Sequence, residues 1–189
     1  MLPICGIRRG TAVERMKANR GLLEWVDSII FAVVVLALVF TFGVRVVQVD
    51  GSSMNPGLVD GERLLLSSLP YEPEYGDVVV IDSYTDYGKL LIKRVIGKSG
   101  DVIDIDFEQG IVYRNGEALE EPYTADKTYL SEGATFPITV PEGMLFIMGD
   151  NRNDSKDSRS PEIGCVSEGD VLGQAVLRLT PFNKFGLIG

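Results

Sequence analysis

Three short segments of this 189-residue chain carry side chains that could do chemistry. The first, residues 50–58 (DGSSMNPGL), places two serines directly after a glycine. Glycine lets the backbone approach a ligand closely, and a serine beside it can offer both its hydroxyl and its N–H. An ordinary serine-rich turn has the same composition, so this segment alone predicts no site.

The second segment, residues 89–97 (KLLIKRVIG), places Lys93 and Arg94 after apolar residues of a predicted strand. Successive strand residues face opposite sides, so one of the two points toward the buried face or a groove. A lysine taken out of water loses its preference for the charged form, and a neutral amine is a competent general base near neutral pH. The plainer alternative is a lysine that snorkels or forms an ion pair.

The third segment, residues 148–159 (MGDNRNDSKDSR), follows an apolar strand and is too polar for a core. Its density of Asp, Asn and Arg predicts a loop cross-bonded by its own side chains. Calcium is a rival ligand because the oxygen donors are many, but the spacing is not that of an EF-hand and three cationic side chains are interleaved. We therefore expect no metal and no cofactor.

The chain contains no histidine, which excludes Ser-His-Asp and Cys-His machinery. A serine, a strand lysine and a bracing polar loop are then the parts of a Ser-Lys hydrolase. The net charge of −9 argues against nucleic acid as a partner. Cys5 and Cys165, far apart in the sequence, make no disulfide framework.

An uncharged apolar run, residues 29–44, separates a basic tail from an acidic body. Residues 1–28 carry a net charge of +2, and residues 29–189 carry −11. Sixteen helical residues cover about 24 Å, and Arg45 could snorkel so that residues 46–49 lengthen the span. The pattern predicts a transmembrane signal anchor over residues 29–45, with a cytoplasmic tail at 1–28 and an extracytoplasmic domain at 46–189. A cleaved leader is disfavoured because no Ala-x-Ala follows the run.

The remaining segments are short, rich in Val, Ile and Leu, and punctuated by Gly, Pro, Asp and Asn. The predicted strands are 46–49, 63–69, 77–84, 89–97, 101–107, 110–116, 135–140, 144–149 and 170–179. No soluble stretch shows sustained helical periodicity. The sequence therefore predicts a mostly β chain, with one N-terminal transmembrane helix and an antiparallel sandwich or barrel-like catalytic domain.

The chain resembles the bacterial type I signal peptidases in five ordered segments, and it resembles their single-span form. The segments are the N-terminal anchor, residues 51–56 (GSSMNP), residues 76–80 (GDVVV), residues 93–101 (KRVIGKSGD) and residues 149–159 (GDNRNDSKDSR). The closing residues 173–186 also look like the last strand of that family. The match covers essentially the whole chain.

The resemblance implies a role for each matching residue. Ser53 corresponds to the nucleophile and Lys93 to the general base. Ser155 corresponds to a serine that hydrogen-bonds the lysine amine, Asp157 and Arg159 to a supporting ion pair, and Asp150 to a carboxylate that braces the loop. Ser53 N–H corresponds to one oxyanion donor, and the second corresponds to Gly51, which offers only its backbone because it lacks the hydroxyl of the two-span enzymes. Gly57, where threonine is usual, is expected to loosen the loop after the nucleophile.

The resemblance also implies two shallow apolar pockets that accept small side chains and so read Ala-x-Ala. The residues expected to flank them are Val47, Val49, Met54, Leu58, Leu64, Val80, Leu91 and Ile92. The implied enzyme is a serine endopeptidase of the cell membrane that removes signal peptides from exported preproteins through an acyl-enzyme. Its partners are those signal peptides and the lipid bilayer. Two rivals stay open: a Ser-Lys self-cleavage domain like those of DNA-damage repressors, and an inactive module that only holds signal peptides.

Overall fold

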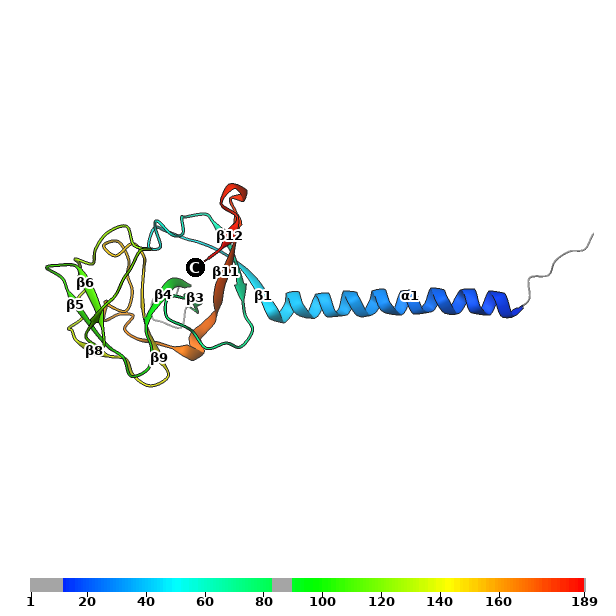
Figure 1. The fold of residues 1–189 in the computed structure, drawn as a ribbon, viewed down its shortest axis with the longest axis horizontal. Helices are drawn as coiled ribbons and strands as arrows, with labels where there is room; N and C mark the ends of the chain where they lie inside the picture. The colour runs from blue at the N-terminus through cyan, green and yellow to red at the C-terminus, as the bar shows by residue number, and fades with distance from the viewer. Residues whose placement is uncertain (1–11, 83–89, 189) are drawn as a thin grey trace, which may run out of the picture. The chain divides into compact units, whose positions relative to one another are not determined.

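The structure is a computed structural model that describes residues 12–82 and 90–188, and its chain divides into two compact units (Figure 1). The first unit is Met1–Phe42 and the second is Gly43–Gly189. The second unit therefore begins three residues before the predicted boundary at residue 46.

In the described part of the first unit, helix α1 (Ala12–Leu38) leads into the π-helical turn η1 (Val39–Gly43), whose last residue begins the second unit. Val44 and Arg45 already belong to strand β1 (Val44–Gln48), so the helix predicted over residues 29–45 ends too late by two residues. The extension of the span through residues 46–49 is also wrong, because the β1 residues pair with a neighbouring strand. Over the described residues, no helix combines the length and the apolarity that crossing a bilayer requires.

The second unit is built on two antiparallel sheets, which confirms the predicted mostly β class. The larger sheet has the order β1-β2-β11-β3-β4-β9-β10, with β12 paired to β11. Its further strands are β2 (Arg63–Ser67), β3 (Val78–Ile81), β4 (Leu91–Gly97), β9 (Met144–Met148), β10 (Val166–Ser167), β11 (Val171–Thr180) and β12 (Gly186–Leu187). Short 3-10 turns at Glu168–Asp170 (η2) and Phe182–Lys184 (η3) flank β11.

The smaller sheet has the order β7-β6-β5-β8 and contains the predicted hairpin. β5 (Val102–Asp106) and β6 (Ile111–Arg114) pair antiparallel across the turn at residues 107–110. β7 (Glu117–Ala118) and β8 (Ile138–Thr139) complete it. The strands that the sequence did not predict, β7, β10 and β12, are two residues each, which is too short for an alternating pattern to register. Part of the segments predicted at 77–84 and 89–97 lies outside the described residues.

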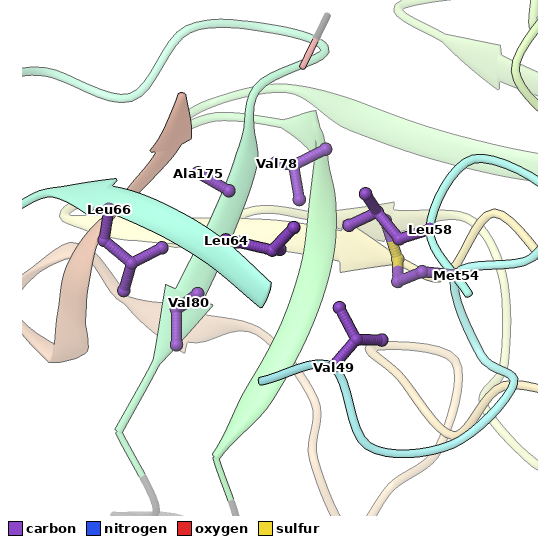
Figure 2. Close-up of a cluster of buried hydrophobic side chains, with 8 residues drawn as sticks. All are labelled: Val49, Met54, Leu58, Leu64, Leu66, Val78, Val80 and Ala175. Carbon is purple, nitrogen blue, oxygen red and sulfur yellow. The ribbon is translucent and has the colours of Figure 1, made fainter. Parts of the chain in front are cut away.

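Strand β2 shows how the sequence builds the core beside the site. Leu64 and Leu66 face inward and are fully buried, whereas Arg63 on the same strand is exposed. Figure 2 shows both leucines in a cluster with Val78, Val80 and Ala175 of neighbouring strands and with Val49, Met54 and Leu58 of the segment after β1. The loop that carries the serines is thus fixed to the sheet through its apolar side chains.

We predict that Leu66→Ala lowers the free energy of unfolding by about 2 to 5 kcal/mol, because it removes methyl groups from a closely packed site. Leu66 has no exposed surface, whereas Leu69, just after the same strand, is 60% exposed. Leu69→Ala is therefore the matched control, and it should change the unfolding free energy by less than about 1 kcal/mol. Chemical denaturation in detergent measures both. Equal losses would show that the core does not extend to Leu66.

Candidate active site

Ser53 lies in a loop that leaves strand β1 and returns to strand β2. Backbone hydrogen bonds from Val49 N to Glu62 O (2.8 Å) and from Gly61 N to Val49 O (3.0 Å) close the base of this loop. Met54, directly after the serine, is buried in the core cluster of Figure 2. Because the side chain of Met54 is held in the core, the backbone at Ser53 is fixed in position.

Lys93 reaches that hydroxyl from the middle of strand β4. Its Nζ donates to Ser53 Oγ at 2.7 Å and to the carbonyl of Ile92 at 3.1 Å. The lysine is only 3% exposed. Arg94, the next residue, is equally buried and reaches a different partner, so both members of the predicted pair are inside the protein, where the sequence placed only one.

Burial of Lys93 lowers the pKa of its amine from 10.5 to about 8, because the ammonium form loses its hydration. The negative charges of Asp157 and Asp150 act in the opposite direction and raise this pKa, and Arg159 lowers it further. The desolvation effect is the largest of these. A useful fraction of the amine is therefore neutral near pH 8, as a general base requires.

Gly149, directly after strand β9, lets the backbone pass close to both Ser53 and Ser155. A Cβ on this glycine would lie 2.1 Å from Ser155 Oγ and 2.5 Å from the carbonyl oxygen of Ser53. Both distances are far inside van der Waals contact, so no residue with a side chain fits here without moving the site. Glycine is required by close approach and not by an unusual backbone angle.

Asp157 is the acceptor around which the end of this loop is organised. Its Oδ2 accepts from Ser155 Oγ (2.9 Å) and from Gly149 N (2.9 Å), and its two oxygens form a bidentate ion pair with Arg159. All of these groups are buried. The hydrogen bond of the Ser155 hydroxyl thus goes to Asp157, whereas the resemblance implied that it goes to the amine of Lys93.

Asp150 is bound to the arginine that follows the lysine. Arg94 Nε and Nη2 donate to its two oxygens at 2.8 and 2.7 Å, and neither side chain has more than a trace of exposed surface. A Cβ at Gly57 would lie 2.9 Å from Asp150 Oδ2, while Arg178 donates to the Gly57 carbonyl. Gly57 therefore packs tightly against its neighbours, and the expectation that it loosens the loop is wrong.

Glu121, Thr128 and Tyr123 belong to this network and were not predicted from the sequence. Arg152 forms a bidentate ion pair with Glu121 (2.6 Å for each bond), and Thr128 Oγ1 accepts a further bond from it. The Arg94 guanidinium lies over the ring of Tyr123 at 4.1 Å. No local signal pointed to these partners, because the third segment contains three aspartates of its own and Arg152 pairs with the distant Glu121.

The two predicted oxyanion donors differ in the structure. The N–H of Gly51 donates to Asp60 Oδ1 at 2.8 Å, so it is already engaged. The glycine has φ +92°, which places it in the left-handed region that favours glycine. For the N–H of Ser53, no acceptor is found among the residues that the structure describes.

A pocket of about 750 Å³ opens in front of Ser53 and Lys93. Six of the eight predicted substrate-binding residues line it: Val47, Val49, Met54, Val80, Leu91 and Ile92. Leu58 and Leu64 do not; they lie in the core behind its wall, with 2% and 0% exposed surface. Side chains that the sequence did not single out also line the pocket, including Asp50, Glu132 and Asn153.

Comparisons with known proteins identify one family and several relatives. The family described as signal peptidase, peptidase S26, matches residues 22–180. Signal peptidase I of Bacillus licheniformis is 37% identical over 184 residues, which are 92% of this chain and 97% of that protein. Signal peptidase IB of Staphylococcus aureus is 34% identical, over 88% of this chain and 94% of that protein. A crystal structure of a signal peptidase I from Enterococcus faecalis is 30% identical, with a TM-score of 0.46, and the match covers 55% of this chain and 97% of that one.

The lowered pKa of Lys93 predicts that the charged lysine destabilises the folded protein below about pH 8. Lys93→Met removes this effect. The unfolded chain holds the proton up to pH 10.5 and the folded chain only to about 8, so stability rises with pH between these values. The advantage of Lys93→Met over the native protein should therefore shrink by about 2 kcal/mol from about pH 7 to about pH 9.5. Denaturant unfolding in detergent at both pH values measures this. A pH-independent difference would mean that the amine is not desolvated.

Proposed function

Because this chain belongs to the signal peptidase family, peptidase S26, and is a signal peptidase I that removes signal peptides from secreted preproteins, we propose that Ser53 is its nucleophile and Lys93 its general base. The observation that carries the proposal is the 2.7 Å contact between Lys93 Nζ and Ser53 Oγ at the wall of a pocket. Burial of the amine supports the same roles.

The reaction is an acyl transfer in two steps. Once Lys93 has lost its proton, its lone pair accepts the proton of Ser53 Oγ, and the oxygen attacks the scissile carbonyl. The carbonyl electrons move to the oxygen, and the N–H of Ser53 stabilises the oxyanion. The intermediate collapses to an ester on the signal-peptide side, while the leaving amine takes the proton from Lys93. The neutral amine then activates water, which hydrolyses the ester.

We attribute a preference for small side chains to the pocket wall. Its six apolar residues come from the end of β1, the serine loop, β3 and β4, and they leave room beside Ser53 for an extended peptide. A peptide held along a strand places alternate side chains on one face, so the first and third residues before the cut enter the wall together. Shallow apolar sites of this kind admit alanine and exclude larger side chains, which favours Ala-x-Ala-like sequences.

We also place the enzyme at the cell membrane as a single-pass protein with its N-terminus in the cytoplasm. The support is the uncharged run of residues 29–44 after a tail of net charge +2. The expected arrangement leaves the unit that begins at Gly43 on the outer side, where exported preproteins emerge. The lipid bilayer and signal peptides are then its partners.

An apolar row on the outer face of the second unit supports this location. Val46, Leu65, Leu177 and Leu187 are in register across β1, β2, β11 and β12. Directly paired residues of antiparallel strands point to the same face. The outermost members, Val46 and Leu187, are 58% and 87% exposed. A row of this kind suits the boundary of a bilayer better than open water.

Variants of the two proposed catalytic residues test the assignment. Ser53→Ala, Lys93→Ala and Lys93→Arg should each reduce preprotein cleavage by a factor of at least about 10³, because nucleophile and base act as a unit and a guanidinium does not deprotonate. In the native enzyme the rate should rise with pH to a plateau above about 8, the pKa of Lys93. Gel assays of preprotein processing measure both.

Lys98→Arg is the matched control, since Lys98 is partly exposed and pairs with Glu74 at 3.6 Å. It should leave cleavage unchanged. An active Lys93→Arg enzyme would contradict the Ser-Lys assignment, and a native chain that binds signal peptides without cutting them would favour the inactive binding module.

Removal of residues 1–42 tests the membrane location. The remaining unit contains both catalytic residues, so cleavage of a short soluble peptide should stay within about threefold of the full chain. Cleavage of a preprotein in liposomes should fall by about 100-fold, because the two molecules no longer share one surface. Comparing both substrates with both proteins gives the result. Equal losses on the two substrates would mean that the N-terminal unit serves the fold of the catalytic unit and not its position.

A further inference from the structure

Asn151 holds the backbone of the nucleophile segment from the opposite side of the site. Its backbone N–H donates to the carbonyl of Ser53 at 3.0 Å, and its side-chain Nδ2 donates to the carbonyl of Ser52 at 3.2 Å. These bonds join segments almost 100 positions apart. The same loop makes a third contact, in which Ser52 Oγ donates to Asp154 Oδ2 at 2.6 Å. The backbone on both sides of the nucleophile is therefore fixed by residues 151–154.

The bond to Ser52 determines where the N–H of Ser53 points. The Ser52–Ser53 peptide is trans, since it is not among the cis bonds of the described chain, and a trans peptide directs its C=O and N–H to opposite sides. Asn151 Nδ2 and Asn55 N (3.0 Å) both hold the C=O of this unit. The N–H of Ser53 is thereby turned away from them, and it finds no acceptor within the described residues.

We propose that Asn151 is a positioning residue that aims the Ser53 N–H at the developing oxyanion. This inference rests on the proposed function, because it assigns a role in the same acyl transfer. Asn151 is not among the residues that line the pocket, and it acts through the Ser52–Ser53 peptide plane. The N–H of Gly51 is already bonded to Asp60, so the proposed oxyanion donor is the N–H of Ser53. The role of Asn151 is to set the direction of that N–H.

The chemistry of the amide makes the proposal sensitive to a small substitution. A carbonyl oxygen only accepts hydrogen bonds, so the group facing Ser52 O must be a donor. Asn151→Ala removes that donor and keeps the backbone bond to Ser53. Asn151→Asp keeps the size and shape of the side chain but turns an acceptor toward the carbonyl, which repels it.

Asn153 provides a matched control in the same loop. It also makes two side-chain bonds, accepting from Tyr129 N and donating to the Lys127 carbonyl, each at 3.0 Å. These bonds fasten the loop to residues 127–129 and not to the nucleophile. Asn153 also lines the pocket, so Asn153→Ala reports the combined effect of loosening the loop and changing the pocket wall, and its ratio of aldehyde to peptide affinity is the quantity compared with the Asn151 variants.

The experiment compares transition-state and ground-state affinity in the full-length enzyme. A peptide aldehyde forms a hemiacetal with Ser53 whose oxygen occupies the oxyanion position, whereas the matching peptide bound to Ser53→Ala measures ground-state affinity. At a pH above the Lys93 pKa, Asn151→Ala should lower kcat about tenfold and weaken the aldehyde by the same factor. Peptide affinity should not change, and Asn151→Asp should lose more than Asn151→Ala.

Three results would overturn the inference: unchanged aldehyde affinity in both Asn151 variants, an equal loss of peptide affinity, or the same selective loss of aldehyde affinity in Asn153→Ala. Thermal unfolding of each variant identifies a loss that comes from misfolding, and the isosteric Asn151→Asp keeps the test open if Asn151→Ala is unstable. Failure of the proposed function has a different signature, because then the native enzyme itself would not cleave a preprotein.

Discussion

The burial of one lysine amine is the condition on which this site depends. The Lys93 ammonium is stable in water, and an interior that removes the water shifts the balance toward the neutral amine. The shift is moderate because Asp157 and Asp150 are near enough to favour the charged form. An entirely apolar surrounding would depress the pKa further and weaken the base, while closer carboxylates would keep the lysine charged. The site lies between these limits.

The loop after β9 surrounds the buried amine with carboxylates that are already paired with arginines. Asp150 and Asp157 are each held by a guanidinium, so the charges that face Lys93 are partly balanced and cannot move toward it. Buried ion pairs of this kind add little to stability after their desolvation cost, and their effect here is geometric. Through Asp157 they fix the backbone at Gly149, whose N–H donates to that carboxylate.

The sequence was informative where the chemistry is local. The short apolar run of Leu64, Leu65 and Leu66 between polar residues indicated a strand, and the turn after residue 106 indicated a hairpin. It was less informative where partners are distant. Glu121 and Tyr123 could not be assigned to Arg152 and Arg94 because nothing local links them. Leu58 and Leu64 have the composition of pocket residues, and only the packing shows that they lie one layer deeper. The composition of the third segment likewise did not show that the Ser155 hydroxyl donates to Asp157.

The order of strands in the larger sheet determines how late in synthesis the active site can be completed. Ser53 follows β1 and precedes β2, whereas Lys93 belongs to β4, which pairs with β3. These two pairs of strands do not touch as neighbours; β11, near the end of the chain, lies between β2 and β3 and joins them. During synthesis, Lys93 is made 78 residues and Ser53 118 residues before Val171, where the strand that joins the two halves begins. A chain that ends before β11 therefore lacks the strand that connects the half carrying the nucleophile to the half carrying the base.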